Sequence, residues 1–178
     1  MKLIPAILST FATLLTVTSI YAESHHHGAH VHGKGKLDIA IDNTSVHMQL
    51  IVPTQDILGF EKIQTPYQLS ALNKALDQLT SGGFWILPKK AKCTLVNAKT
   101  LKPTDDYLKH DSHDHNHPEH SDIAVAYSYQ CLNPKALNVL KTTFFEHFTG
   151  SNLIEVQALT ATEQRSGTLT PEKIEFRL

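Results

Sequence analysis

The sequence predicts an α+β domain in which a mostly antiparallel sheet has two helices packed on one face. Runs of alternating apolar and polar residues predict the strands, and leucines at helical spacing predict the first helix. At both predicted helix starts, Thr65-Pro66 and Asn133-Pro134, a capping residue precedes proline. The elements follow one another as strand, strand, helix, strand in each half of the chain, which suggests an internal duplication.

The first predicted element after the histidine-containing N-terminal part is a β-hairpin. Apolar and polar residues alternate over Leu37–Ile41 and again over Val46–Val52. The turn sequence Asp42-Asn43-Thr44-Ser45 separates the two runs. A period of two on both sides of a turn predicts a hairpin with one buried face.

Two helices and five further strands are predicted along the rest of the chain. The first helix begins at Thr65-Pro66, ends at Ser81-Gly82-Gly83, and has an apolar stripe formed by Leu69, Leu72, Leu76 and Leu79. The second begins at Asn133-Pro134 and ends at Gly150, with Leu137, Leu140, Phe144 and Phe148 facing the core. The strands are predicted at Phe84–Leu87, Ala91–Val96, Ile123–Cys131, Leu153–Ala161 and Lys173–Leu178.

The N-terminal residues 1–22 are typical of a cleaved export signal. Lys2 provides the positive start, Leu3–Val17 is largely apolar, and Ala22 is a small residue at the expected cleavage position. Cleavage there leaves residues 23–178, which we divide into a histidine-rich segment, 23–35, and a single domain, 36–178. An uncleaved membrane anchor is the alternative, and no later stretch is apolar enough to insert into a membrane.

Charge and cysteine content narrow the class of protein. The formal net charge of −1 and the lack of a long basic run argue against nucleic acid as a partner. The two cysteines, Cys93 and Cys131, fit one disulfide formed in an oxidising compartment. A zinc site that uses both thiolates is the alternative, but the two residues lack the CxxC pairing that such sites often have.

Histidine is the most informative residue type, because ten of the twelve histidines lie in two short clusters. Neutral imidazole is a common ligand of zinc, copper and nickel. The first cluster contains His25, His26, His27, His30 and His32. The second contains His110, His113, His115, His117 and His120, with Asp111 and Asp114 as oxygen ligands or as acceptors that raise imidazole basicity. We therefore predict a Zn²⁺-binding protein, with Cu²⁺ or Ni²⁺ as open alternatives.

The second cluster lies in a predicted loop, residues 101–121, that has almost no apolar residues. Such a segment cannot bury enough surface to offset its ordering entropy, so we expect it to be mobile without metal. A bridge between Cys93 and Cys131 is expected to pin the base of this loop, because the two cysteines lie on the strands that flank it. The isolated His47 and His147 are expected to be surface or packing residues.

No catalytic signature accompanies these clusters. The sequence contains no HExxH, GxSxG or P-loop motif. A catalytic zinc site has a few fixed ligands and an open position, whereas this chain offers an excess of imidazoles in polar segments. The composition therefore favours a non-enzymatic metal-binding protein over a metal-dependent enzyme, and it does not separate a zinc-acquisition protein from a metal buffer or detoxification protein.

The order of several motifs resembles one family, the ZrgA-type zinc-regulated periplasmic zinc uptake proteins of Gram-negative bacteria. The shared segments are His30-Val31-His32-Gly33, Leu37–Asp42, Pro53 with Gly59-Phe60-Glu61, Phe84 with Leu87-Pro88, Cys93, the histidine-rich insertion, Tyr127–Cys131, Pro134, Phe145 with Phe148, and Leu169-Thr170-Pro171. The family pattern often continues Gly-Phe-Glu with histidine, where this chain has Lys62. The resemblance implies a periplasmic location and a role in high-affinity zinc import. It also implies a partner that receives the ion, either a periplasmic zinc-binding protein or an ABC-type zinc importer.

Overall fold

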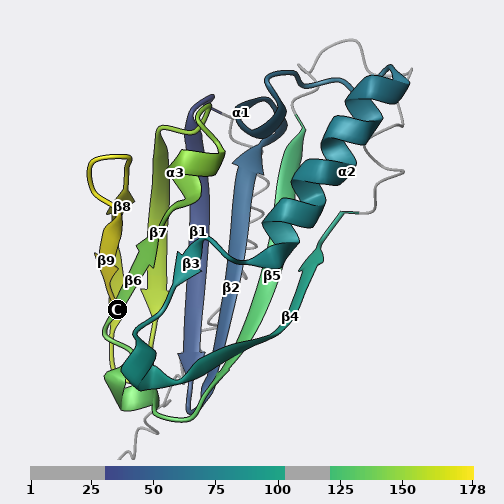
Figure 1. Ribbon diagram of the computed structural model, residues 1–178. Helices are drawn as coiled ribbons and strands as arrows, with labels where there is room; N and C mark the ends of the chain where they lie inside the picture. Colours follow the sequence, from purple (N-terminus) through teal and green to yellow (C-terminus); the bar gives the residue numbers. More distant parts are fainter. Residues whose placement is uncertain (1–30, 103–120) are drawn as a thin grey trace, which may run out of the picture.

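The computed structural model describes residues 31–102 and 121–178, and these residues form a larger sheet with helices and a smaller sheet on one of its faces (Figure 1). The larger sheet has the strand order β4-β5-β2-β1-β7-β8, and the smaller has the order β3-β6-β9. The strands are β1 (Lys34–Asp42), β2 (Ser45–Pro53), β3 (Trp85–Ile86), β4 (Cys93–Thr100), β5 (Asp122–Cys131), β6 (Val139–Thr142), β7 (Leu153–Leu159), β8 (Gln164–Leu169) and β9 (Glu175–Arg177). The helices are α1 (Thr54–Leu58), α2 (Pro66–Ser81) and α3 (Phe144–His147), with 3₁₀ turns η1 (Lys89–Ala91) and η3 (Pro134–Ala136). The predicted α+β class with a mostly antiparallel sheet is confirmed.

The predicted hairpin is confirmed as β1 and β2. Leu37 pairs with Leu50 and Ile39 with Met48, so that the apolar residues of both strands share one buried face. Asn43 turns the chain between the strands with a φ of 49°, a left-handed conformation that asparagine adopts more readily than most residues.

The first predicted helix is confirmed as α2. Its N-terminus has a capping box, because the Thr65 side chain accepts from the Gln68 N–H while the Gln68 side chain accepts from the Thr65 N–H. Leu72 and Leu79 are fully buried against the sheet, and Gly82 ends the helix in a left-handed conformation. The helix therefore covers the sheet with the leucine stripe that the spacing predicts.

The second predicted helix, over residues 133–150, is wrong as an element. The chain forms η3, then β6, then the single turn α3. The four residues expected to face the core are buried, but from three different pieces of chain: Leu137, Leu140, Phe144 and Phe148. Val139 and Thr142 are β-branched and pair well in a sheet, which favours a strand where spacing alone favoured a helix. The second half consequently does not repeat the long helix on which the suggested duplication depended.

The edge of the larger sheet formed by β7 and β8 has two features that were not predicted. Strand β7 pairs with β1 in parallel, and β8 pairs with β7 as an edge strand. The short strand β8 has the polar sequence Gln164–Leu169, which lacks the apolar alternation of a half-buried strand. The strands predicted at 153–161 and 173–178 are confirmed as β7 and β9, with shorter bounds.

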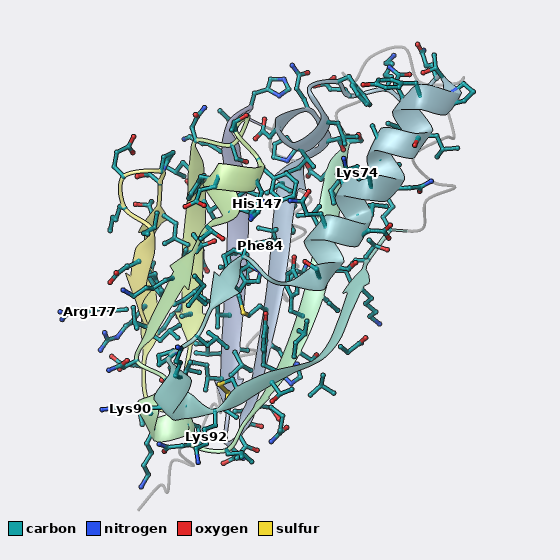
Figure 2. The ribbon with its side chains drawn as sticks, in the orientation of Figure 1. Lys74, Phe84, Lys90, Lys92, His147 and Arg177 are labelled. Atoms are coloured by element: carbon teal, nitrogen blue, oxygen red, sulfur yellow. A yellow bond between two sulfur atoms is a disulfide. The ribbon has the colours of Figure 1, made fainter. Side chains whose placement is uncertain are left out.

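The core lies between the larger sheet and the layer formed by α2, α3 and the smaller sheet (Figure 1). Phe84 lies at its centre, with its ring 5.0 Å from that of Trp85 and 5.4 Å from that of Phe144 (Figure 2). Both pairs have the edge-to-face arrangement that aromatic quadrupoles favour. Within the two described ranges, no helix is long and apolar enough to cross a membrane.

The predicted disulfide between Cys93 and Cys131 is present, and the two residues pair across β4 and β5. Its position differs from the expectation that it pins the base of the 101–121 segment. Cys93 begins β4 and Cys131 ends β5, whereas the chain enters that segment after Thr100 and leaves it before Asp122. The bridge therefore lies at the opposite end of the strand pair.

Candidate metal centre

The described residues contain one of the twelve predicted metal ligands, His32. The other eleven lie outside the described residues: His25, His26, His27, His30, His110, Asp111, His113, Asp114, His115, His117 and His120. The geometry that bears on a metal site is therefore that of His32 and of the residues where the chain enters and leaves the two clusters.

Both clusters attach to the same end of the larger sheet. Residues 31–33 lead into β1, β4 ends at Thr100, and Ser121 precedes β5. The pairs Lys36–Ile51 and Pro53–Asp122 place the start of β1, the end of β2 and the start of β5 beside one another. Helix α1 lies at this end of the sheet (Figure 1). We call this region the α1 corner and define it by His32, Gly33, Thr54, Asp56, Glu61 and Ser121.

Ser121, the last residue of the 101–121 segment, is held in the α1 corner by hydrogen bonds. Its hydroxyl lies 2.8 Å from Thr54 Oγ1 and 3.2 Å from the Glu61 carbonyl oxygen. Its carbonyl accepts a 2.8 Å hydrogen bond from the Thr54 N–H. Thr54 is fully buried, so these contacts fix a hydroxyl and an amide that would otherwise be costly to bury.

Gly33, which directly follows the first histidine cluster, is held by several backbone hydrogen bonds. Its N–H donates to both carboxylate oxygens of Asp56, at 2.9 and 2.8 Å, and its carbonyl accepts from the N–H groups of Asn152 and Leu153. Its φ of +81° is left-handed, and a Cβ at this position would lie 2.8 Å from Asn152 Nδ2. The left-handed backbone conformation therefore favours glycine here, and the position of the preceding residue, His32, is set by this lock.

His32 faces the carboxylate of Glu61, a residue of the Gly59-Phe60-Glu61 motif that was not predicted to be a ligand. Its Nε2 lies 3.2 Å from Glu61 Oε1, and the side chains of His32 and Glu61 are 49% and 23% exposed. The pair is thus accessible from solvent while its backbone is anchored on both sides, through Gly33 and through the Glu61 carbonyl.

Asp56 adds a second carboxylate to the α1 corner, and it is buried. Burial raises the pKa of this carboxyl, because desolvation penalises the charged form, while the Gly33 N–H and the nearby His32 act in the opposite direction. The interaction with His32 places Asp56 within electrostatic range of the imidazole. A metal ion bound beside His32 would therefore lie within electrostatic range of two carboxyl groups, those of Glu61 and Asp56.

The described residues provide fewer ligands than a closed metal site requires. Within 31–102 and 121–178, no group of three or more histidine, cysteine or carboxylate side chains is placed to hold a metal ion. The two isolated histidines lie elsewhere: His47 is on β2, where its Nδ1 lies 3.2 Å from Ser128 Oγ, and His147 ends α3. The α1 corner can supply a nitrogen and an oxygen to a metal, and any further ligands have to come from other parts of the chain or from water.

Comparison with known proteins agrees with this chemistry. No curated protein matches the chain. A family described as the ZrgA family zinc uptake protein matches residues 29–178, a span that includes His30, His32 and the whole 101–121 segment. Because the match covers most of the sequence, the chain belongs to the ZrgA family of zinc uptake proteins.

Proposed function

We propose that this chain is an exported, periplasmic zinc-binding protein that captures Zn²⁺ with its two histidine clusters and passes the ion to an import system. Membership of a zinc uptake family supports zinc as the cargo. The observation that carries the proposal is the α1 corner. There His32 of the first cluster and Ser121, which directly follows the second cluster, both contact Glu61.

The proposed ligands are the residues of the two clusters. They are His25, His26, His27, His30 and His32, together with His110, His113, His115, His117 and His120, with Asp111 and Asp114 as additional oxygen donors. Zinc needs three or four such ligands at about 2.0–2.1 Å. Attachment of both segments to one corner raises the effective concentration of each cluster near the other, which for short tethers is on the order of millimolar. Sites that combine ligands from both clusters follow naturally from this arrangement.

The excess of imidazoles over the needs of one ion allows transfer by ligand exchange. A zinc ion can exchange one histidine for another without passing through the free hydrated ion, and it can do the same with a ligand of a receiving protein. We propose a periplasmic zinc-binding protein or an ABC-type zinc importer as that receiver. Protons compete for the same nitrogens, so capture weakens as the pH falls below about 6.5.

Calorimetric titration of the mature chain, residues 23–178, against a competing zinc chelator tests this function. The informative variant replaces His110, His113, His115, His117 and His120 with asparagine, which keeps the length and polarity of the segment. The matched control replaces His47 and His147 in the same way. We expect submicromolar zinc binding in the wild type and in the control, and its loss in the cluster variant.

Other outcomes would change the assignment in defined ways. Several weak sites in the wild type, with none below micromolar, would favour a buffer or detoxification protein. An unchanged tight site in the cluster variant would refute the role of the second cluster. Loss of the folded structure in that variant, measured by circular dichroism, would mean that the metal is structural.

A further inference from the structure

We propose that Glu61 is a zinc ligand and that, with His32, it forms a two-ligand seat for Zn²⁺ on the folded domain. This inference rests on the proposed function and names a site within it that composition does not reveal. Glu61 lies in none of the histidine clusters, and its partner is 29 positions away in the sequence. The seat is made by the folding of the chain, since Glu61 and His32 come from segments on either side of the β1–β2 hairpin.

The separation of the two donor atoms fits a shared zinc ion. Zinc bound tetrahedrally at about 2.0–2.1 Å by two ligands holds those ligands roughly 3.3 Å apart. The distance between His32 Nε2 and Glu61 Oε1 is 3.2 Å. Zinc can therefore enter between them with little movement of either residue.

The chemistry of the exchange is balanced. His32 would bind zinc as the neutral imidazole, with the lone pair of Nε2 donated to the metal and the single ring proton on Nδ1. Any proton on Nε2 has to leave to solvent or be replaced by one on Nδ1, and a carboxylate oxygen of Glu61 would provide the second bond. The carboxylate also offsets one of the two charges of the ion, as the nearby Asp56 does at longer range.

The surroundings of the seat hold it in place but leave it open. Gly33 is locked by Asp56, Asn152 and Leu153, and the Glu61 carbonyl is contacted by Ser121. The His32 and Glu61 side chains are nevertheless 49% and 23% exposed. Two protein ligands leave the other coordination positions to water or to incoming ligands. A site of this kind binds zinc less tightly than a closed four-ligand site and releases it readily, which suits a point of transfer.

An ordinary ion pair is the competing explanation, because a 3.2 Å contact between histidine and glutamate also occurs without any metal. The two explanations differ in what zinc does to His32. A seat requires that the imidazole nitrogen bind the metal and that binding depend on the Glu61 carboxylate. An ion pair requires neither.

The test is a zinc titration of the mature chain followed by the NMR signals of the histidine ring nitrogens, each assigned to its residue. The variants are Glu61→Gln, which keeps the size and hydrogen-bonding capacity of the side chain, and Glu61→Asp, which withdraws the carboxylate by one methylene. Glu155→Gln, on the exposed face of β7, is the matched control. Dispersion of the amide signals reports the fold of each variant.

We expect zinc to shift His32 Nε2 in the wild type and in Glu155→Gln. The half-shift in Glu61→Gln should require at least about tenfold more zinc, with Glu61→Asp intermediate. If Glu61→Gln does not fold, Glu61→Asp still has to show a several-fold effect. A His32 signal that stays in place while other histidines shift, or equal titrations of wild type and both folded Glu61 variants, would overturn the seat but leave the proposed function standing. If no histidine responds to zinc, the proposed function itself fails.

Discussion

The two ends of the β4–β5 strand pair are held together in different ways. At one end the Cys93–Cys131 disulfide joins the strands covalently, beside Lys92, whose carbonyl accepts from the Leu132 N–H (Figure 2). At the other end the Leu101 N–H donates to the Ala124 carbonyl, and the nearby α1 corner adds hydrogen bonds from Ser121 to α1 and from Gly33 to Asp56. The covalent crosslink thus lies at the end of the strand pair opposite to Thr100 and Ser121. A change at the disulfide should therefore leave the α1 corner largely intact.

The largest expected effect comes from removing the disulfide. The bridge closes a sequence separation of 38 residues, for which the chain-entropy estimate is about 4 kcal/mol. The double variant Cys93→Ala with Cys131→Ala should lose about that much free energy of unfolding in a denaturant titration. Its zinc affinity, measured against a chelator under conditions where it remains folded, should equal that of the wild type. A weaker zinc site in the folded variant would show that the two ends are coupled.

The buried carboxylate of the α1 corner should have the next largest effect. Asp56→Ala leaves the Gly33 N–H without its acceptor and should cost about 2 kcal/mol in denaturant unfolding. The same variant should weaken zinc binding at His32, because the lock on Gly33 is lost. Asp56→Asn keeps one acceptor oxygen and should cost less, and Asp38→Ala on the exposed face of β1 should be nearly neutral. Equal stability losses for Asp56→Ala and Asp38→Ala would contradict the lock.

A smaller effect is expected from the tie at Ser121. Ser121→Ala removes the hydroxyl that contacts Thr54 and the Glu61 carbonyl, and should cost about 1 kcal/mol. The N–H of Thr54, which donates to the Ser121 carbonyl, should exchange faster with deuterated solvent in this variant. Ser166→Ala on the edge strand β8 is the matched control. If both variants protect the Thr54 amide equally, the hydroxyl of Ser121 does not hold the corner together.

The smallest effect at neutral pH is expected near the disulfide end, at Tyr129. Its buried hydroxyl has no hydrogen-bond partner within residues 31–102 and 121–178, and burial raises its pKa to about 12. Tyr129→Phe should therefore change stability by less than about 0.5 kcal/mol at pH 7. Tyr127→Phe, which loses a 3.0 Å bond to the Leu79 carbonyl, should cost about 1 kcal/mol.

The same residue predicts how stability responds to alkali. Above pH about 10 the unfolded chain ionises Tyr129, whereas the folded chain keeps it protonated up to about pH 12. Ionisation therefore stabilises the unfolded state before it stabilises the folded state, and the free energy of unfolding falls as the pH rises through this window. Denaturant titrations at several alkaline pH values should show a shallower fall in Tyr129→Phe. An identical pH dependence in the two proteins would mean that Tyr129 titrates normally.

Local pattern was a good guide to some elements and a poor guide to others. The hairpin and α2 could be predicted because their periodicity agrees with both burial and turn chemistry. The helix predicted over residues 133–150 was wrong because its apolar residues, three and four apart, are buried by separate elements rather than by one helix. The parallel pairing of β1 with β7 could not be predicted from the sequence, because the register of two distant strands is set by tertiary packing.

The residues of the candidate site also differ in how far the sequence predicts them. Composition alone identified His32, because histidine is concentrated around it. Glu61 could be named as part of the Gly59-Phe60-Glu61 motif but not as a neighbour of His32, and Asp56 stood in no motif. The relation of both to His32 exists only after α1 packs against the start of β1. Gly33 could be named as part of a motif, but the reason for glycine there required its left-handed φ and the nearby Asn152.

The parallel pairing of β1 with β7 has a consequence for the order in which the protein can be built. Lys34 pairs with Leu153, so the first strand of the domain completes its place in the sheet only with residues near the C-terminus. Ribosomes synthesise the chain from its N-terminus, so β1 is made early and its partner β7 late, and most of the chain must be made before the two strands can pair. A chain with such distant contacts folds slowly compared with one that has mainly local contacts. The nascent polypeptide therefore cannot complete the larger sheet until the residues of β7 have been made.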